Sequence, residues 1–106
     1  MNKNLELKRA EIFRGRQHKL VFLVLEKNTL MVSEIMRKVN SKIIDSKDGK
    51  TLTLRETSRA LKWLAKKKYA ECLNPSNKHG VKGIIYRLSK KGKEIREKIN
   101  REKKLN

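Results

Sequence analysis

The sequence contains few of the residues that would indicate a secreted, metal-binding or membrane protein. Its 106 residues include one cysteine, Cys72, so the chain can form no internal disulfide and has no cysteine cluster for a metal ion. The longest apolar run, residues 20–25, is far too short to span a membrane. Charged residues precede this run, so we expect no signal peptide and a soluble, cytoplasmic protein without a membrane partner.

Arrangements of residues that carry out catalysis are also missing. The sequence has no recognisable Ser/His/Asp or Cys/His set, no carboxylate pair and no phosphate-binding loop. His18, His79 and Cys72 do not have the spacing of zinc ligands. We therefore expect a protein that is not an enzyme and that uses no cofactor and no metal ion.

Acidic residues are scarce as well, and the resulting positive charge is unevenly distributed. The chain has 29 Lys and Arg against 11 Asp and Glu, a formal net charge of +18. Residues 37–68 hold 11 basic and 3 acidic residues, whereas residues 20–36 hold one lysine and two glutamates. Such an excess destabilises a compact domain by self-repulsion, which an anionic partner relieves. Nucleic acid is the usual partner of a basic globular domain, and an anionic membrane surface is the main competitor.

Length and composition indicate one folded domain over residues 1–106. Hydrophobic residues make up 37% of the chain, enough for one modest core. Within this domain we expect an N-terminal arm or helix at 1–16, a core at 17–88 and a C-terminal helix at 89–106.

Hydrophobic patterning predicts two helices and a long turn in the first half of the chain. Residues 17–27 contain the apolar run, and a helix of this kind must be covered on more than one side. Residues 30–40 repeat apolar positions at three- and four-residue spacing, which predicts an amphipathic helix. Residues 41–52 include an Asp-Gly pair, a strong turn signal.

The next predicted helix separates apolar and basic residues onto opposite faces. It begins after Thr53, which is followed three residues later by Glu56 in the capping-box pattern, and it runs to about Lys68. At 100° per residue the apolar face carries Leu54, Thr57, Leu61, Leu64 and Ala65, and the opposite face carries Arg55, Arg59, Lys62 and Lys66.

A hairpin and a last helix are predicted to follow. Residues 69–73 and 84–88 are typical of strands, and the polar loop at 75–83 joins them. Ser89 is a suitable cap for a final helix at about 90–104. The expected fold class is therefore mainly α with a small β-hairpin.

These elements and three local sequences resemble winged helix-turn-helix proteins, in particular MarR-like and ArsR-like transcriptional regulators. Residues 57–69, TSRALKWLAKKKY, resemble their recognition helix and its exit. Residues 84–94, IIYRLSKKGKE, resemble the second wing strand and the start of the last helix, and residues 32–35, VSEI, resemble the opening of the first helix of the motif. The Lys, Ile and Asn content is typical of an archaeal or AT-rich source. Two departures stand out: the segment 41–52 is longer than the family's turn, and Lys68 replaces the usual glycine.

The resemblance implies binding of double-stranded DNA, with the helix at about 54–68 in the major groove and a two- or three-stranded wing on the backbone. Arginine can bond both O6 and N7 of guanine, so Arg55 and Arg59 are the candidates for base contacts. Ser58 and Lys62 are candidates for phosphate contacts. The full set of residues expected to contact DNA is Thr53, Arg55, Ser58, Arg59, Lys62, Lys66, Lys78, His79 and Lys82.

Two further expectations concern partners. Regulators of this class usually bind as dimers, and the apolar run together with Ile12, Phe13, Ile95 and Ile99 offers more apolar surface than three short helices need. Trp63 lies away from the main apolar face, and packing against a neighbouring element is its expected role. The alternatives to a regulator are a non-specific architectural DNA binder and a winged-helix subunit that binds protein or RNA.

Overall fold

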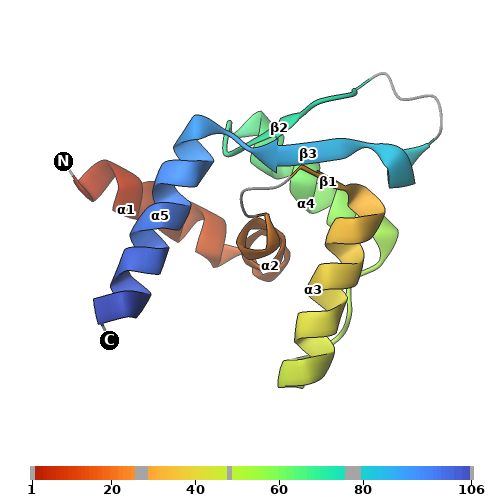
Figure 1. The fold of residues 1–106 in the computed structure, drawn as a ribbon, viewed down its shortest axis with the longest axis horizontal. Helices are drawn as coiled ribbons and strands as arrows, with labels where there is room; N and C mark the ends of the chain where they lie inside the picture. Colours follow the sequence, from red (N-terminus) through yellow and green to blue (C-terminus); the bar gives the residue numbers. More distant parts are fainter. Residues whose placement is uncertain (1, 26–28, 48, 76–79, 106) are drawn as a thin grey trace.

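The structure is a computed structural model that describes residues 2–25, 29–47, 49–75 and 80–105. Within these ranges the chain forms five α-helices, one short 3-10 helix and three short strands (Figure 1). The predicted fold class, mainly α with a small β-sheet, is therefore confirmed. In chain order the elements are α1 (Asn2–Arg14), α2 (Arg16–Val24), β1 (Leu30–Met31), α3 (Val32–Ser46), α4 (Leu54–Lys66), β2 (Ala70–Cys72), the 3-10 helix η1 (Val81–Gly83), β3 (Ile85–Leu88) and α5 (Lys90–Leu105).

A three-stranded antiparallel sheet lies along one side of the helices, with β3 in the middle (Figure 1). β2 and β3 form the predicted hairpin, in which Ala70 pairs with Leu88. β1 pairs with the other edge of β3, and Leu30 lies opposite Tyr86. The expected helix at 30–40 is wrong for its first two residues, because Leu30 and Met31 form β1. A two-residue strand is too short for an alternating pattern, so only its pairing with β3 reveals it.

α2 is the central helix and is covered on several sides, as its apolar run predicts. Val21, Phe22 and Leu25 are fully buried, and α1, α3 and α4 all pack against this helix. Full burial of one such side chain stabilises a fold by roughly 1.5–3 kcal/mol. None of the helices in the described part of the chain has the length and apolar character needed to cross a bilayer.

The terminal helices complete this core from one end of the molecule. α1 and α5 lie side by side at the left of Figure 1, on the opposite side of α2 from α3. Ile12 of α1 and Ile95 and Ile99 of α5 are buried, and Phe13 is partly buried. These residues are already covered within one chain, so they no longer support the expectation of a dimer.

α3 continues well beyond the expected end of its helix at residue 40 and finishes at Ser46. Ile43 extends the buried row of Ile35 and Val39 by one more turn. The stabilisation from burying this row exceeds the tendency of the surrounding polar residues to form a turn. The predicted long turn at 41–52 is therefore wrong in its first half. The connection to α4 is only residues 47–53.

Two side chains hold this connection in place. Asn40 donates from Nδ2 to the carbonyl oxygen of Leu52 at 3.0 Å and accepts from the Leu52 amide at 2.7 Å. Arg16, at the start of α2, donates from Nη2 to the carbonyl oxygen of Lys50 at 2.8 Å. The backbone is therefore fixed at Lys50 and Leu52, just before α4 begins.

α4 ends at Lys66 in a hydrogen-bonded motif that normally uses glycine. Lys68 has a left-handed φ of 71°, and its amide donates to the carbonyl oxygen of Ala65 at 3.0 Å. The next amide, that of Tyr69, donates to the carbonyl oxygen of Leu64 at 2.8 Å. This pair of bonds defines a Schellman motif, which turns the chain directly into β2.

Ser89 caps α5, as predicted, and also ties this helix to the end of α4. Its hydroxyl oxygen accepts from the Gly92 amide at 3.0 Å, the N-cap to N3 bond, and donates to the carbonyl oxygen of Lys68 at 2.6 Å. Gly92 lies so close to the carbonyl oxygen of Tyr69 that no side chain fits there. The joint between α4 and α5 therefore requires a residue without a Cβ.

Candidate nucleic-acid interface

The start of α4 is fixed by the predicted capping box. Thr53 Oγ1 accepts from the Glu56 amide at 3.1 Å, and Glu56 Oε1 accepts from the Thr53 amide at 2.9 Å. Gln17 of α2 donates from Nε2 to the other carboxylate oxygen of Glu56 at 2.8 Å. The Thr53 N–H is the main cause that lowers the pKa of Glu56, with the hydroxyl of Thr53 and the amide of Gln17 acting in the same direction. The N-terminus of α4 is thus attached to α2, and the Thr53 hydroxyl takes part in the helix cap.

α4 buries one face and exposes a row of cations on the other. Thr57, Ala60, Leu61 and Leu64 are buried. Arg55, Arg59, Lys62 and Lys66 are exposed, and among the described residues none of these four side chains forms an ion pair or hydrogen bond. The only acidic residue of the helix, Glu56, is held in the cap. We call Arg55, Arg59, Lys62 and Lys66 the α4 basic row.

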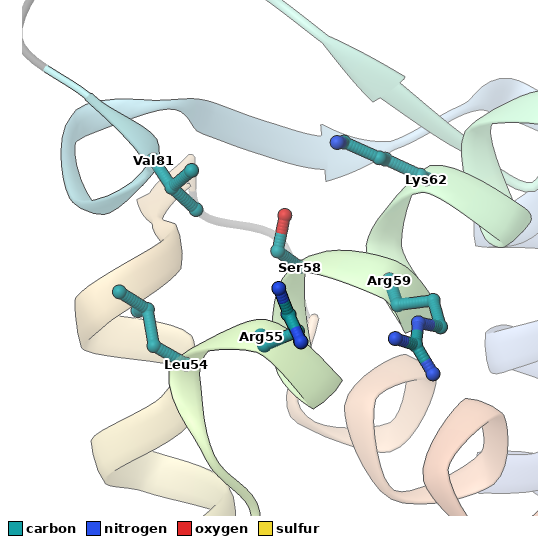
Figure 2. A pocket seen from close by; sticks show the side chains of 6 residues that line it. All are labelled: Leu54, Arg55, Ser58, Arg59, Lys62 and Val81. Atoms are coloured by element: carbon teal, nitrogen blue, oxygen red, sulfur yellow. The ribbon is translucent and has the colours of Figure 1, made fainter.

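A hollow of about 400 Å³ lies between α4 and η1, beside this row. Figure 2 shows its lining: five side chains come from α4 and one from η1. The lining residues are Leu54, Arg55, Ser58, Arg59, Lys62 and Val81. Four of the six were expected from the sequence to contact DNA, and the structure brings these four together with an apolar pair that was not expected.

Ser58 departs from its expected exposure. A residue expected to contact phosphate should be exposed, but the exposed fraction of Ser58 is 6%. It points toward the space between α4 and η1, where its hydroxyl lines the hollow (Figure 2). Helical spacing alone cannot reveal this shielding, because it depends on how α4 packs against other parts of the fold.

The base of the hairpin is held by Asn74, a residue that no sequence pattern marks out. Its Nδ2 donates to the carbonyl oxygen of Gly83 at 3.0 Å, and its Oδ1 accepts from the Ile85 amide at 2.6 Å. Lys82 is exposed in η1. Lys78 and His79, the other residues expected to contact DNA from the hairpin, lie outside the described residues.

Trp63 packs against α2, which confirms the expected contact with a neighbouring element. Its ring stacks on that of His18 with 4.0 Å between centroids and 6° between planes. The Tyr69 ring lies at 6.3 Å in a tilted arrangement. Burial lowers the pKa of His18 below its ordinary value, which favours the neutral ring in this stack. The stack joins the side of α4 to the first turn of α2.

Beyond this face, acidic residues accompany the cations of the terminal helices. Arg9 of α1 pairs with Glu102 of α5, and Lys98 of α5 pairs with Glu6 of α1 at 3.2 Å. Lys67, just after α4, lies 3.8 Å from a carboxylate oxygen of Glu11. These ion pairs connect helices to each other.

Glu11 also accepts a hydrogen bond from the Tyr69 hydroxyl at 2.8 Å. Burial is the main cause that raises the pKa of Tyr69, and the Glu11 carboxylate raises it further.

In residues 2–25, 29–47, 49–75 and 80–105, no three His, Cys, Asp or Glu side chains gather in a way that could hold a metal ion. No protein-family model, curated protein or solved structure matches the chain.

Proposed function

We propose that this protein binds double-stranded DNA, with α4 in the major groove and the β2–β3 hairpin against the neighbouring sugar-phosphate backbone. The observation that carries the proposal is the α4 basic row, four exposed cations on one helix face without an acidic partner among the described residues. Unpaired cations in a row repel one another, and a polyanion removes that repulsion while gaining counterion release.

The residue types suit different parts of a duplex. Arg55 and Arg59 carry guanidinium forks that can bond O6 and N7 of guanine, and they lie one helical turn apart on the exposed face (Figure 2). Lys62, Lys66 and Lys82 supply point charges for phosphates, and the Ser58 hydroxyl can donate to a phosphate that enters the hollow.

The arrangement of elements supports the same proposal. The succession α2, β1, α3, α4 and the β2–β3 hairpin has the order of a winged helix-turn-helix domain. α4 occupies the place of the recognition helix, one face of which must be buried while the other faces the groove. We therefore propose a cytoplasmic, sequence-specific transcriptional regulator rather than an enzyme. Binding as a homodimer stays a prediction, and its support is now only the class resemblance.

The test compares two arginine variants that lose the same charge. A duplex selected from a random pool and a scrambled duplex of equal length are titrated with the wild type, with Arg59→Ala and with Arg101→Ala. Arg101 is exposed near the end of α5 and serves as the matched control. Loss of a base contact should reduce the preference for the selected duplex by about tenfold or more in Arg59→Ala only.

Other outcomes identify the alternatives. Equal affinity for every duplex, with a steep decrease as salt rises, would support the non-specific architectural binder instead of a regulator. Equal duplex affinity of wild type and a variant lacking the whole α4 basic row would contradict the proposed interface. Tighter binding to RNA of the same sequence than to DNA would favour the RNA-binding subunit.

A further inference from the structure

The hollow between α4 and η1 has two chemically different sides. Leu54 and Val81 both lie on one side of it, while Arg59 and Lys62 lie on the other (Figure 2). The Val81 side chain is 39% exposed, which makes it one of the few large apolar residues exposed on the described surface. The hollow therefore offers an apolar contact directly beside unpaired cations.

The Val81 side chain is not needed to complete the core. The hydrophobic core and the apolar residues packed on it include its neighbour Ile84 but not Val81. The backbone of Val81 does have a structural role, since its carbonyl oxygen accepts from the Ile84 amide at 3.2 Å. Any residue at this position could accept that bond, because every residue has a backbone carbonyl. The apolar side chain at the opening of this cationic hollow is therefore available for contact with whatever the hollow binds.

DNA presents an apolar group close to anionic and hydrogen-bonding groups in one place. The 5-methyl group of thymine projects into the major groove, next to base-edge acceptors and within reach of the phosphates. An apolar side chain that touches this methyl group distinguishes thymine from the other bases. Leu54 is the first residue of α4, and the N-terminal residues of a recognition helix are those that contact base edges.

We propose that Leu54 and Val81 recognise thymine through its 5-methyl group, while the cations across the hollow bind the adjacent phosphate or guanine. This inference rests on the proposed DNA-binding function and adds a base preference to it. It assigns a specificity role to Val81, a residue of the hairpin base that carries no charge.

The experiment uses duplexes that differ only in methyl groups. The full chain is titrated with an alternating A·T duplex and with the same duplex in which deoxyuridine replaces every thymidine. Removal of one buried methyl group should weaken wild-type binding by about fourfold. In Val81→Ala, which keeps only Leu54 for this contact, the ratio of the two affinities should fall toward one. Leu73→Ala, which shortens a residue of similar exposure outside the hollow, should keep the wild-type ratio.

The results separate this inference from the function on which it rests. Equal binding of both duplexes by the wild type would overturn thymine recognition and leave DNA binding intact. A ratio unchanged in Val81→Ala would overturn the role of Val81 and leave the methyl effect to Leu54 or to a difference in DNA flexibility. Binding to neither duplex, nor to any other duplex at low salt, would overturn the proposed function together with this inference.

Discussion

Two regions of this molecule contain many cations, and they differ in whether acidic residues accompany them. Between α1 and α5 two of the cations have carboxylate partners on the opposite helix: Arg9 pairs with Glu102 and Lys98 with Glu6. The α4 basic row has no such partner in the described part of the chain. The same residue types therefore connect helices in one region and remain available to an external anion in the other.

This difference shows that the positions of the few acidic residues indicate the role of a basic surface better than the number of its basic residues does. Arg55 and Arg59 are four residues apart, as are Lys62 and Lys66, so each pair places like charges on neighbouring turns. Such pairs destabilise a helix by a few tenths of a kcal/mol each. An α4 surface that carries this cost is expected to serve binding, whereas the α1–α5 surface serves stability.

The largest change in stability should come from a substitution in α5, at Gly92. In Gly92→Ala the new Cβ would overlap the backbone carbonyl of Tyr69, so we expect the free energy of unfolding to decrease by about 3 kcal/mol. Urea denaturation followed by circular dichroism measures this change. Lys93→Ala, at the exposed neighbouring position, is the control and should change it by less than about 0.5 kcal/mol. A similar small change in Gly92→Ala would show that the joint is not tightly packed.

The second effect separates the two regions by their response to salt. Removing two cations that bind phosphates should reduce the slope of log affinity against log salt by up to about two units. We expect this in Lys62→Ala/Lys66→Ala, and no change in Lys93→Ala/Arg101→Ala, which removes the same charge from α5. Equal reductions in both double variants would mean that DNA contacts the whole surface rather than the α4 face.

The third effect is smaller and has opposite signs in the two regions. Arg59→Gln should raise the free energy of unfolding by a few tenths of a kcal/mol, because it removes repulsion from Arg55. Arg9→Gln should lower it by up to about 1 kcal/mol, because it removes a partly exposed ion pair with Glu102. Thermal unfolding at low and high salt measures both, and salt should diminish both differences. Changes of the same sign would contradict the division into binding and structural surfaces.

The smallest effect concerns the stack that borders the α4 basic row. Trp63 is the only tryptophan, and the pKa of His18 beside it is lowered by burial. Because the folded state favours neutral His18, its contribution to stability is present above about pH 6.5 and is lost as the pH falls. Tryptophan fluorescence of the folded protein should change with a midpoint below pH 6.5. In His18→Gln this transition should be absent, and a midpoint above 6.5 would contradict the burial of the ring.

Local patterns predicted the parts of the interface that depend on neighbouring residues. The capping box of Thr53 and Glu56, the cap at Ser89 and the exposed positions of the α4 basic row all follow from spacings within one helix. Lys68 shows a limit of such patterns. It takes the left-handed conformation expected of glycine at a cost of roughly 1–2 kcal/mol, which the two hydrogen bonds of the helix end help to offset.

Features that depend on distant residues could not be predicted in this way. The shielding of Ser58, the strand at Leu30, the contact of Gln17 with Glu56 and the brace at Asn74 each require knowledge of a second segment. The extent of α3 was underestimated for a related reason, since only the packed core shows that Ile43 has a place to be buried.

The central position of β3 also determines the order in which the molecule can be completed during synthesis. β1 and β2 both pair with β3 and not with each other, so neither has a partner before residues 85–88 leave the ribosome. By then α2, α3 and α4 have all been made and can pack together, because domains begin to fold from the N-terminal side as the chain emerges. Pairing of distant strands is slow compared with helix formation. The cationic surface of α4 therefore exists in the nascent chain before the hairpin beside it is fixed, and the sheet closes only after α2, α3 and α4 have been made.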